Sequence, residues 1–291
     1  MKFSSLVPAL VALFASGISP VSAARILMAG DSTMADSRSS IQGWGTPFAK
    51  YISLPVINLA RGGRSARSYY REGLQAALVS QIEEGDYVII EFGHNDGGSP
   101  ATSDRAPSIT DFGKTLGDGT QTTEVKDANG TVEIVQTFVT YEKWFIRDII
   151  AKGGIPVVSS TTPNGDVWNS AHTEMLEPNR FVPYAKMAAG SFTQATYVDH
   201  YEFVTIAFET LGYEKVYPKL FPNDHTHTSP EGADVVAQAF VNGLKCTNHP
   251  LANCLTDAGY ALTIKCRFVT LFPSYPRKGL VNLTIVQFPV K

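Results

Sequence analysis

Short apolar segments alternate with longer amphipathic segments along most of this chain. The short segments are rich in β-branched residues and have the length of buried strands, whereas the longer ones repeat apolar residues with the period of a helix. This alternation predicts an α/β fold, in which helices cover both faces of a parallel sheet. The predicted strands are 25–28, 55–59, 87–92, 155–159 and 195–198, and the predicted helices are 44–52, 74–84, 137–151, 179–193 and 230 to about 244.

The loops after the predicted strands are the places to look for a functional site, because parallel sheets of this class bind ligands beyond the carboxyl ends of their strands. Polar residues and glycines fill most of these loops. The long segment 97–131 is rich in Gly, Ser, Thr and Asp, has no clear period and is predicted to be an irregular loop. The strand-end loops are 29–33, 60–64, 93–96, 161–164 and 221–230, of which the last precedes the final helix.

Ser32 lies directly after the first predicted strand, where its hydroxyl can be presented at the edge of the sheet. A serine becomes a nucleophile when an imidazole takes its proton and a carboxylate orients that imidazole. Asp224 and His227 can supply both groups, because a turn before Pro230 can fold their side chains toward each other. The sequence therefore predicts that Ser32, His227 and Asp224 form a catalytic triad, and it leaves His225 unassigned.

An ester hydrolase of this kind also needs hydrogen-bond donors for the negative oxygen that forms during the reaction. The predicted donors are the backbone amides of Ser32 and Gly63 and the side-chain amide of Asn95, each from a different strand-end loop. Gly63 suits this role because a residue without a Cβ atom lets the backbone approach closely. Each signal alone is common in structural turns, so the prediction depends on their combination at successive strand ends.

Four short blocks resemble those of the SGNH, or GDSL, hydrolases: Gly30-Asp31-Ser32, Gly63, Gly93-His94-Asn95-Asp96 and Asp224-x-x-His227. Between about residues 25 and 244, the stretches "AGDSTMA", "GRSARSY", "VIIEFGHNDGGS" and "DHTHTSPEGA" are similar to the rhamnogalacturonan acetylesterases, a family that removes acetyl groups from pectin. The resemblance implies a flavodoxin-like three-layer αβα sandwich around a five-stranded parallel sheet, with no metal and no other cofactor. It also implies that Ser32 is the nucleophile, His227 the base and Asp224 its partner, and that Ser32, Gly63 and Asn95 form the oxyanion hole.

Two features depart from this family. Some of its members hold the loop after the Asn-Asp block with a disulfide, whereas 97–131 contains no cysteine, which leaves the shape of this loop open. The apolar and basic segment 260–291 matches no part of the family, and it is either a genuine extension or the translation of an unspliced intron. We therefore expect a hydrolase domain at 24–259, followed by a C-terminal tail of uncertain status.

The first 23 residues have the features of a secretory signal peptide. Lys2 provides a positive start, 6–14 form an apolar run that is too short to span a bilayer, and 21–23 are small residues suited to cleavage. No later stretch reaches the roughly 18 to 20 uninterrupted apolar residues of a spanning helix. We therefore expect a secreted, extracellular protein without a membrane partner, and its net charge of −3 argues against binding to nucleic acid.

Three cysteines, Cys246, Cys254 and Cys266, lie near the C-terminus. In a secreted chain they predict one disulfide and one remaining thiol, with the pairing left open. Asn129 and Asn282 each begin an Asn-x-Thr sequence for N-glycosylation. Each of these two matches is as compatible with an unused coincidence as with an occupied site.

Together, these features predict a secreted serine esterase that acts as a monomer and removes acetyl groups from rhamnogalacturonan, a pectic polysaccharide, through an acyl-enzyme. Arg64 is the best candidate among the neighbouring arginines for binding a galacturonate carboxylate. Trp168 is a candidate for stacking on a sugar ring. The alternatives are that the arginines face solvent or pair with Asp31, Glu91 or Asp96, and that the aromatic rings are buried.

Three other functions are compatible with parts of the pattern. The acetyl groups could belong to another plant cell-wall polysaccharide, such as xylan. A metal-dependent hydrolase could use nitrogen and oxygen ligands, but it would leave the Ser32 and Gly63 loops unexplained. A non-catalytic carbohydrate-binding protein would need no base beside a hydroxyl. The ligands available to a metal site are Asp31, His94, Asp96, His225 and His227.

Overall fold

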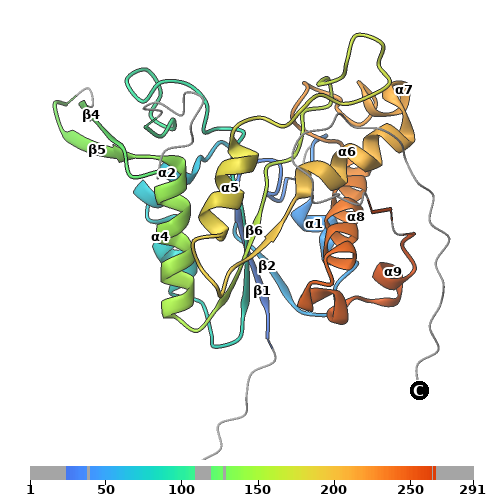
Figure 1. The fold of residues 1–291 in the computed structure, drawn as a ribbon, viewed down its shortest axis with the longest axis horizontal. Coiled ribbons are helices and arrows are strands. Elements are labelled where there is room, and N and C mark those ends of the chain that lie inside the picture. The colour runs from blue at the N-terminus through green and yellow to red at the C-terminus, as the bar shows by residue number, and fades with distance from the viewer. Residues whose placement is uncertain (1–23, 38–39, 109–118, 127–128, 264, 267–291) are drawn as a thin grey trace, which may run out of the picture.

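A five-stranded parallel sheet forms the centre of the protein (Figure 1). The computed structural model describes residues 24–37, 40–108, 119–126, 129–263 and 265–266. The strand order is β2-β1-β3-β6-β7, and every neighbouring pair is parallel. All five match strands that the sequence predicts, which confirms the α/β class. The strands are β1 (Ile26–Gly30), β2 (Val56–Asn58), β3 (Tyr87–Glu91), β6 (Ile155–Ser159) and β7 (Thr196–Val198).

The two faces of the sheet bury alternate residues of the same strands. In β1, Ile26 and Met28 belong to one apolar core, whereas Leu27 and Ala29 belong to the other. Side chains alternate across a strand, so a strand that is covered on both faces must be apolar at nearly every position. This explains why these strands appear in the sequence as continuous apolar runs.

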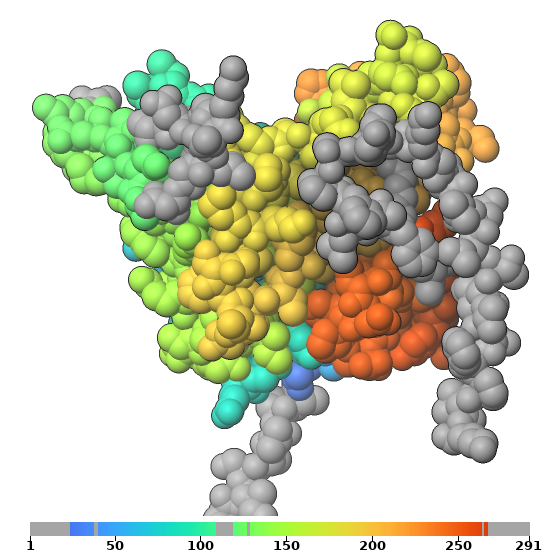
Figure 2. Space-filling view, viewed as in Figure 1, coloured from blue at the N-terminus to red at the C-terminus, as the bar shows by residue number. Residues whose placement is uncertain are grey.

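Helices cover both faces of the sheet and complete a three-layer αβα sandwich. In Figure 2, the green and yellow residues of α4 and α5 lie beside the orange and red residues of the C-terminal helices. The strand order is that of flavodoxin-like folds, so the architecture implied by the resemblance is confirmed. The first core lies beneath α1 (Gly45–Phe48), α6 (His200–Leu211) and α8 (Pro230–Cys246), and the second beneath α2 (Ala66–Arg71), α3 (Leu74–Val79), α4 (Phe138–Ala151) and α5 (Phe181–Ala189).

Two long helices begin at side-chain caps. The Ser229 hydroxyl accepts a hydrogen bond from the amide of Gly232 at 3.1 Å, and Pro230 occupies the first position of α8. The Thr137 hydroxyl accepts from the amide of Thr140 at 3.1 Å at the start of α4. Because these caps are local, the sequence predicts the starts of both helices to within about one residue.

Some secondary structure differs from the prediction. The predicted loop 97–131 contains β4 (Thr122–Lys126), which pairs with β5 (Val132–Gln136) in an antiparallel hairpin. Most residues of the hairpin alternate between exposed and partly buried, and Val135 is the one buried residue of the two strands, so the hairpin lacks the continuous apolar run of a buried strand. Helix α6, which the sequence does not predict, begins at His200, so Asp199 is the single residue between it and β7. The Asp199 side chain caps the helix by accepting a hydrogen bond from the amide of Glu202.

A disulfide between Cys246, at the end of α8, and Cys266 closes the C-terminal region. Cys254 is the remaining thiol, so the predicted single disulfide is confirmed and its pairing is now known. Lys245 Nζ donates a hydrogen bond to the backbone oxygen of Leu262 at 2.7 Å. The chain therefore packs against α8 beyond residue 259, where the sequence predicts the end of the domain. The short helices of this region are α7 (Tyr213–Val216), the 3₁₀ helix η1 (Pro250–Cys254) and α9 (Asp257–Tyr260).

Several predictions fall on residues outside the described ranges: the signal peptide at 1–23, most of the tail at 260–291, and Asn282. Asn129 is exposed in the turn between β4 and β5, and its glycosylation stays a prediction. None of the described helices combines the length and the apolar character needed to cross a membrane.

Candidate active site

Ser32, His227 and Asp224 form a continuous chain of hydrogen bonds at the carboxyl edge of the sheet. Ser32 follows β1, and the other two residues lie in the loop before α8. His227 Nε2 is 2.8 Å from Ser32 Oγ, and His227 Nδ1 is 2.7 Å from Asp224 Oδ2. The structure thus brings together, across 195 positions of the chain, the three side chains that the sequence predicts as a triad.

Asp224 stabilises both the imidazole and the turn of the loop before α8, residues 221–229, which is the candidate catalytic loop. Its Oδ1 accepts hydrogen bonds from the backbone amides of Thr226 at 2.7 Å and His227 at 2.8 Å, which stabilises the turn. Burial alone would raise the pKa of Asp224, but the hydrogen bonds from the His227 side chain and from these two amides lower that pKa to about 2. Because the carboxylate is charged at neutral pH, His227 Nδ1 carries a proton and its Nε2 can accept the proton of the serine hydroxyl.

The turn after β1 is held by Gly30 and Asp31. A Cβ atom on Gly30 would lie 2.7 Å from the backbone oxygen of Glu91 on β3, so the strand end has room only for glycine. Asp31 is buried, and its Oδ1 accepts from the amide and the hydroxyl of Thr33 at 2.9 and 2.8 Å. Its Oδ2 accepts from the amide of His94 at 3.3 Å. These contacts fix the turn after β1 against the loop after β3.

The loops of Gly63 and Asn95 lie against this turn. A Cβ atom on Gly62 would be 3.6 Å from the Cβ of Ser32, and Gly63 has a φ of 75°, in the left-handed region that favours glycine. The side-chain amide of Asn95 donates to the backbone oxygen of Arg64 at 3.3 Å. The three predicted oxyanion-hole residues therefore lie on adjoining loops at one edge of the sheet.

Arg105, which no sequence pattern indicates, connects the loops that carry Gly63 and Asn95. Its Nη1 donates to Asn95 Oδ1 at 3.2 Å and to the backbone oxygen of Gly63 at 3.3 Å. Because Oδ1 is held in this way, the side-chain NH₂ of Asn95 has a defined direction. Arg105 lies in the segment predicted to be an irregular loop, and its contact with Gly63 spans 42 positions, so no local pattern marks it.

Asp96 anchors α2 to the loop after β3. It is fully buried, and its Oδ1 accepts a hydrogen bond from the amide of Ala66, at the start of α2, at 3.0 Å. Burial raises the pKa of Asp96 well above its usual range, and the nearby carboxyls of Asp31 and Glu142 raise it further. The environment thus favours the neutral form of Asp96, which suits a structural role behind Asn95.

The predicted substrate-binding residues, Arg64 and Trp168, have close partners within the protein. Arg64 Nε is 2.9 Å from Glu72 Oε2, rather than near any of the acidic residues expected from the sequence. Trp168 is only 7% exposed, and its indole N–H donates to the backbone oxygen of Gly165 at 2.9 Å. Stacking on a sugar needs an exposed ring face, so the prediction for Trp168 does not fit the structure.

The residues that a metal site would use have separate partners. His225 Nδ1 lies 3.2 Å from Asp166 Oδ2, and His94 Nε2 lies 3.1 Å from the hydroxyl of Thr162. Within the described ranges, no three side chains of His, Cys, Asp or Glu are grouped closely enough to hold a metal ion. His225, which the sequence leaves unassigned, is therefore linked to the loop after β6.

A cavity of about 450 Å³ adjoins the catalytic loop. The hydroxyl of Thr226 donates to Asn164 Oδ1, which lines this cavity, at 3.1 Å. Arg180 also lines the cavity, although the sequence shows it only as part of a predicted helix. The lining residues are Gly93, His94, Gly97, Asn164, Asn179, Arg180 and Phe181.

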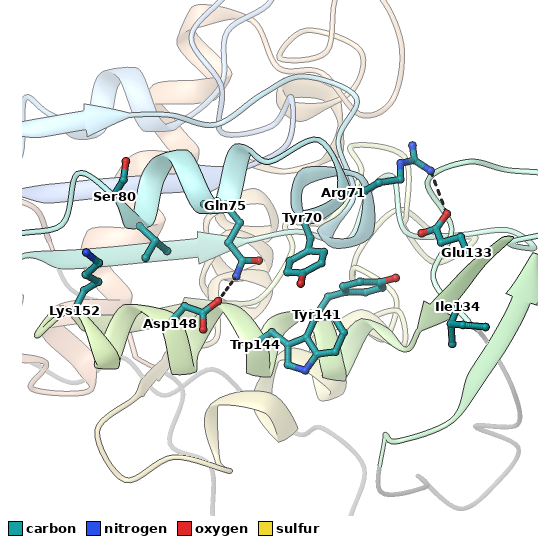
Figure 3. Close-up of a pocket in the computed structure, with 12 residues that line it drawn as sticks. Tyr70, Arg71, Gln75, Ser80, Glu133, Ile134, Tyr141, Trp144, Asp148 and Lys152 are labelled. Atoms are coloured by element: carbon teal, nitrogen blue, oxygen red, sulfur yellow. Dashed lines mark hydrogen bonds and ion pairs between the residues drawn. The ribbon is translucent and has the colours of Figure 1, made fainter. Parts of the chain in front are cut away.

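A larger cavity, of about 760 Å³, lies between α2, α3 and α4 (Figure 3). Its centre is aromatic, with the rings of Tyr70 and Trp144 at 5.0 Å between centroids. None of the triad or oxyanion residues lines it. Size alone therefore does not identify the site of chemistry in this protein.

Sequence comparison identifies the family of the protein. Residues 28–235 match the model of the GDSL-like Lipase/Acylhydrolase family. Because this match spans most of the chain, the protein belongs to that family.

Two relatives that match most of the chain are named as rhamnogalacturonan acetylesterases. It is 44% identical to a rhamnogalacturonan acetylesterase from Emericella nidulans over 237 residues, which cover 81% of this chain and 90% of that protein. It is 26% identical to the probable rhamnogalacturonan acetylesterase YesY from Bacillus subtilis, over 78% of this chain and 94% of that protein. The protein is thus a carboxylic ester hydrolase.

The fold is also similar to that of a solved structure, the protein YxiM from Bacillus subtilis. The TM-score is 0.63 at 22% sequence identity, and the match covers 79% of this chain and 58% of that chain. At this identity the likeness concerns the fold alone.

Proposed function

We propose that the protein is a secreted acetylesterase that removes acetyl groups from rhamnogalacturonan, a pectic polysaccharide. The observation that carries this proposal is the unbroken chain from Asp224 through His227 to Ser32, with distances of 2.7 and 2.8 Å. The 44% identity to the Emericella rhamnogalacturonan acetylesterase supports the choice of substrate. In this proposal the protein acts outside the cell, as a monomer and without a cofactor.

Acylation begins when Ser32 Oγ attacks the carbonyl carbon of the acetyl group and His227 Nε2 takes the hydroxyl proton. The charged Asp224 stabilises the imidazolium that results. The oxyanion of the tetrahedral intermediate accepts hydrogen bonds from the amides of Ser32 and Gly63 and from Asn95 Nδ2, each worth on the order of 3 kcal/mol in the transition state. The imidazolium then protonates the sugar oxygen, the ester C–O bond breaks, and the sugar leaves an acetyl-serine behind.

Deacylation repeats these roles with water as the nucleophile. His227 Nε2 takes a proton from water as the water oxygen attacks the acetyl-serine carbonyl. The second tetrahedral intermediate uses the same three donors. When it collapses, the proton passes from His227 to Ser32 Oγ and acetic acid leaves, which gives up its remaining proton to the solvent as acetate; this restores the starting state.

Acetate release from a panel of polysaccharides tests this function. Acetylated rhamnogalacturonan, homogalacturonan and xylan are compared at equal acetyl concentration, and we expect the highest kcat/KM on rhamnogalacturonan. A higher value on xylan would replace the proposal with a xylan acetylesterase. The same assay with a chelator separates the mechanisms, since a loss of activity that zinc restores contradicts a serine esterase.

A further inference from the structure

The cavity of about 450 Å³ beside the catalytic loop has the dimensions of a ligand site. Sites for small molecules in proteins usually measure about 300–1,000 Å³. Three separate segments form its walls: the loop after β3, the loop after β6 and the start of α5. None of its residues belongs to the triad or to the oxyanion hole.

Two hydrogen bonds join the walls of this cavity to the catalytic loops. Thr226, next to the catalytic base, donates from its hydroxyl to Asn164 Oδ1 at 3.1 Å. In the loop after β3, the amide of His94 donates to Asp31 Oδ2 at 3.3 Å, next to Ser32. When the acetyl group of a polysaccharide lies at Ser32, neighbouring sugars of the same chain are therefore close to the cavity.

Arg180 gives the cavity a positive charge that no described acidic residue pairs with. Its side chain is exposed, and its guanidinium lies over the ring of Phe181, 5.2 Å from the ring centroid. No carboxylate among the described residues pairs with it. By contrast, Arg64 lies 2.9 Å from Glu72. A guanidinium that is held by a ring and faces a cavity is suited to bind a carboxylate.

We propose that this cavity is a subsite for a uronate sugar of the polysaccharide, whose carboxylate binds to Arg180. The amide groups of Asn164 and Asn179 provide neutral donors and acceptors for the sugar hydroxyls. The inference rests on the proposed acetylesterase function and adds the feature by which acidic and neutral polysaccharides are distinguished. The acetyl group itself cannot make this distinction, because it is the same in both.

A comparison of two substrates on two variants isolates the carboxylate contact. Wild type and Arg180→Gln are assayed on acetylated galacturonate oligosaccharides and on neutral acetylated xylo-oligosaccharides. We expect the variant to lose about tenfold more kcat/KM on the acidic substrate than on the neutral one, mainly through KM. High salt narrows this difference, because it screens the exposed charge. Arg180→Lys recovers part of the lost kcat/KM, since lysine keeps the positive charge but lacks the paired N–H donors of the guanidinium.

Arg147→Gln is the matched control. Arg147 lies on α4, outside the cavity, and pairs with Asp148 at 2.7 Å, so the ratio of the two substrates stays at the wild-type value. Circular dichroism verifies that each variant is folded. Equal losses of Arg180→Gln on both substrates, or an unchanged kcat/KM on the acidic one, would overturn the subsite.

A competition assay keeps the subsite testable if the proposed function fails. If the wild type releases no acetate from the acidic oligosaccharide, non-acetylated oligogalacturonate is added during hydrolysis of 4-nitrophenyl acetate. An inhibition constant that rises about tenfold in Arg180→Gln supports the subsite. Absence of inhibition of the wild type, or the same inhibition constant in both proteins, contradicts it.

Discussion

His227 and His200 each lie 2.7 Å from a carboxylate oxygen, but the two pairs have different surroundings. The side chains of His227 and Asp224 are 29% and 44% exposed at the edge of the sheet. Those of His200 and Glu91 are 0% and 1% exposed in the core. The second ring nitrogen of His227 faces the hydroxyl of Ser32, whereas that of His200 faces a backbone oxygen.

The group opposite the second nitrogen determines what each pair can do. The backbone oxygen of Val236 only accepts, so His200 Nε2 must keep its proton and cannot act as a base there. Glu91 also accepts hydrogen bonds from Trp44 and Ser159, at 2.7 and 2.5 Å, which joins elements of the core. A short histidine–carboxylate distance is therefore not by itself a sign of catalysis.

Ser32→Ala removes the proposed nucleophile beside the exposed pair, and it has the largest expected effect. We expect kcat for acetate release to fall by about 10⁶-fold, with an unchanged melting temperature. Ser159→Ala, which removes the serine that donates to Glu91 of the buried pair, serves as the control and should keep its kcat while losing stability. Substantial turnover by Ser32→Ala would rule out the nucleophile.

Asp224→Asn keeps the base, His227, and removes the carboxylate that orients its ring. We expect kcat to fall by about 10⁴-fold, because an amide no longer selects the tautomer of His227 or stabilises its cation. The low pKa of Asp224, about 2, means that its contribution to stability is present above about pH 4 and is lost as the pH falls toward 2. Unfolding curves of wild type and variant should therefore converge at low pH, and a constant difference would contradict this assignment.

Glu91→Ala breaks the buried pair. It leaves the polar groups of His200 and Trp44 without their acceptor in the core, so we expect the free energy of unfolding in urea to fall by about 3–5 kcal/mol. The kcat of the folded fraction stays within a few-fold of wild type. Glu72→Ala, which removes an exposed partner of Arg64, should lower the free energy of unfolding by only about 0–1 kcal/mol. A stable but inactive Glu91→Ala protein would show that the buried pair takes part in catalysis.

Glu142 is a buried carboxyl without a histidine partner, and the effect expected from its substitution is smaller than that of Glu91→Ala. Its Oε2 has no hydrogen-bond partner in the described structure, and burial raises its pKa to about 8. Between about pH 4.5 and 8 the folded state keeps a proton that the unfolded state releases, so stability falls as the pH rises. Between pH 5 and 8, we expect the free energy of unfolding in urea to fall by about 1–3 kcal/mol less in Glu142→Gln than in the wild type. Parallel pH profiles of wild type and variant would contradict the raised pKa.

Much of the candidate site could be predicted because its parts are local. Asp224 and His227 lie three positions apart in one turn, and the backbone hydrogen bonds of that turn involve the same aspartate. Ser32 could be placed opposite them, because the carboxyl ends of parallel strands share one edge. The prediction that Trp168 stacks on a sugar does not fit the structure, because its side chain is buried.

By itself, the sequence determined the α/β alternation, the caps of α4 and α8 and the Asp-x-x-His turn, since each depends on residues within a few positions of one another. The tertiary structure was needed to show that His225 lies beside Asp166 and that Arg105 joins the loops of Gly63 and Asn95. It also shows that no described carboxylate pairs with Arg180, which lines the cavity beside Asn164. It also brought His200 to Glu91 across 109 positions. The physical reason is that such contacts are set by how distant segments pack, and no local period or motif specifies which distant side chains reach hydrogen-bond distance.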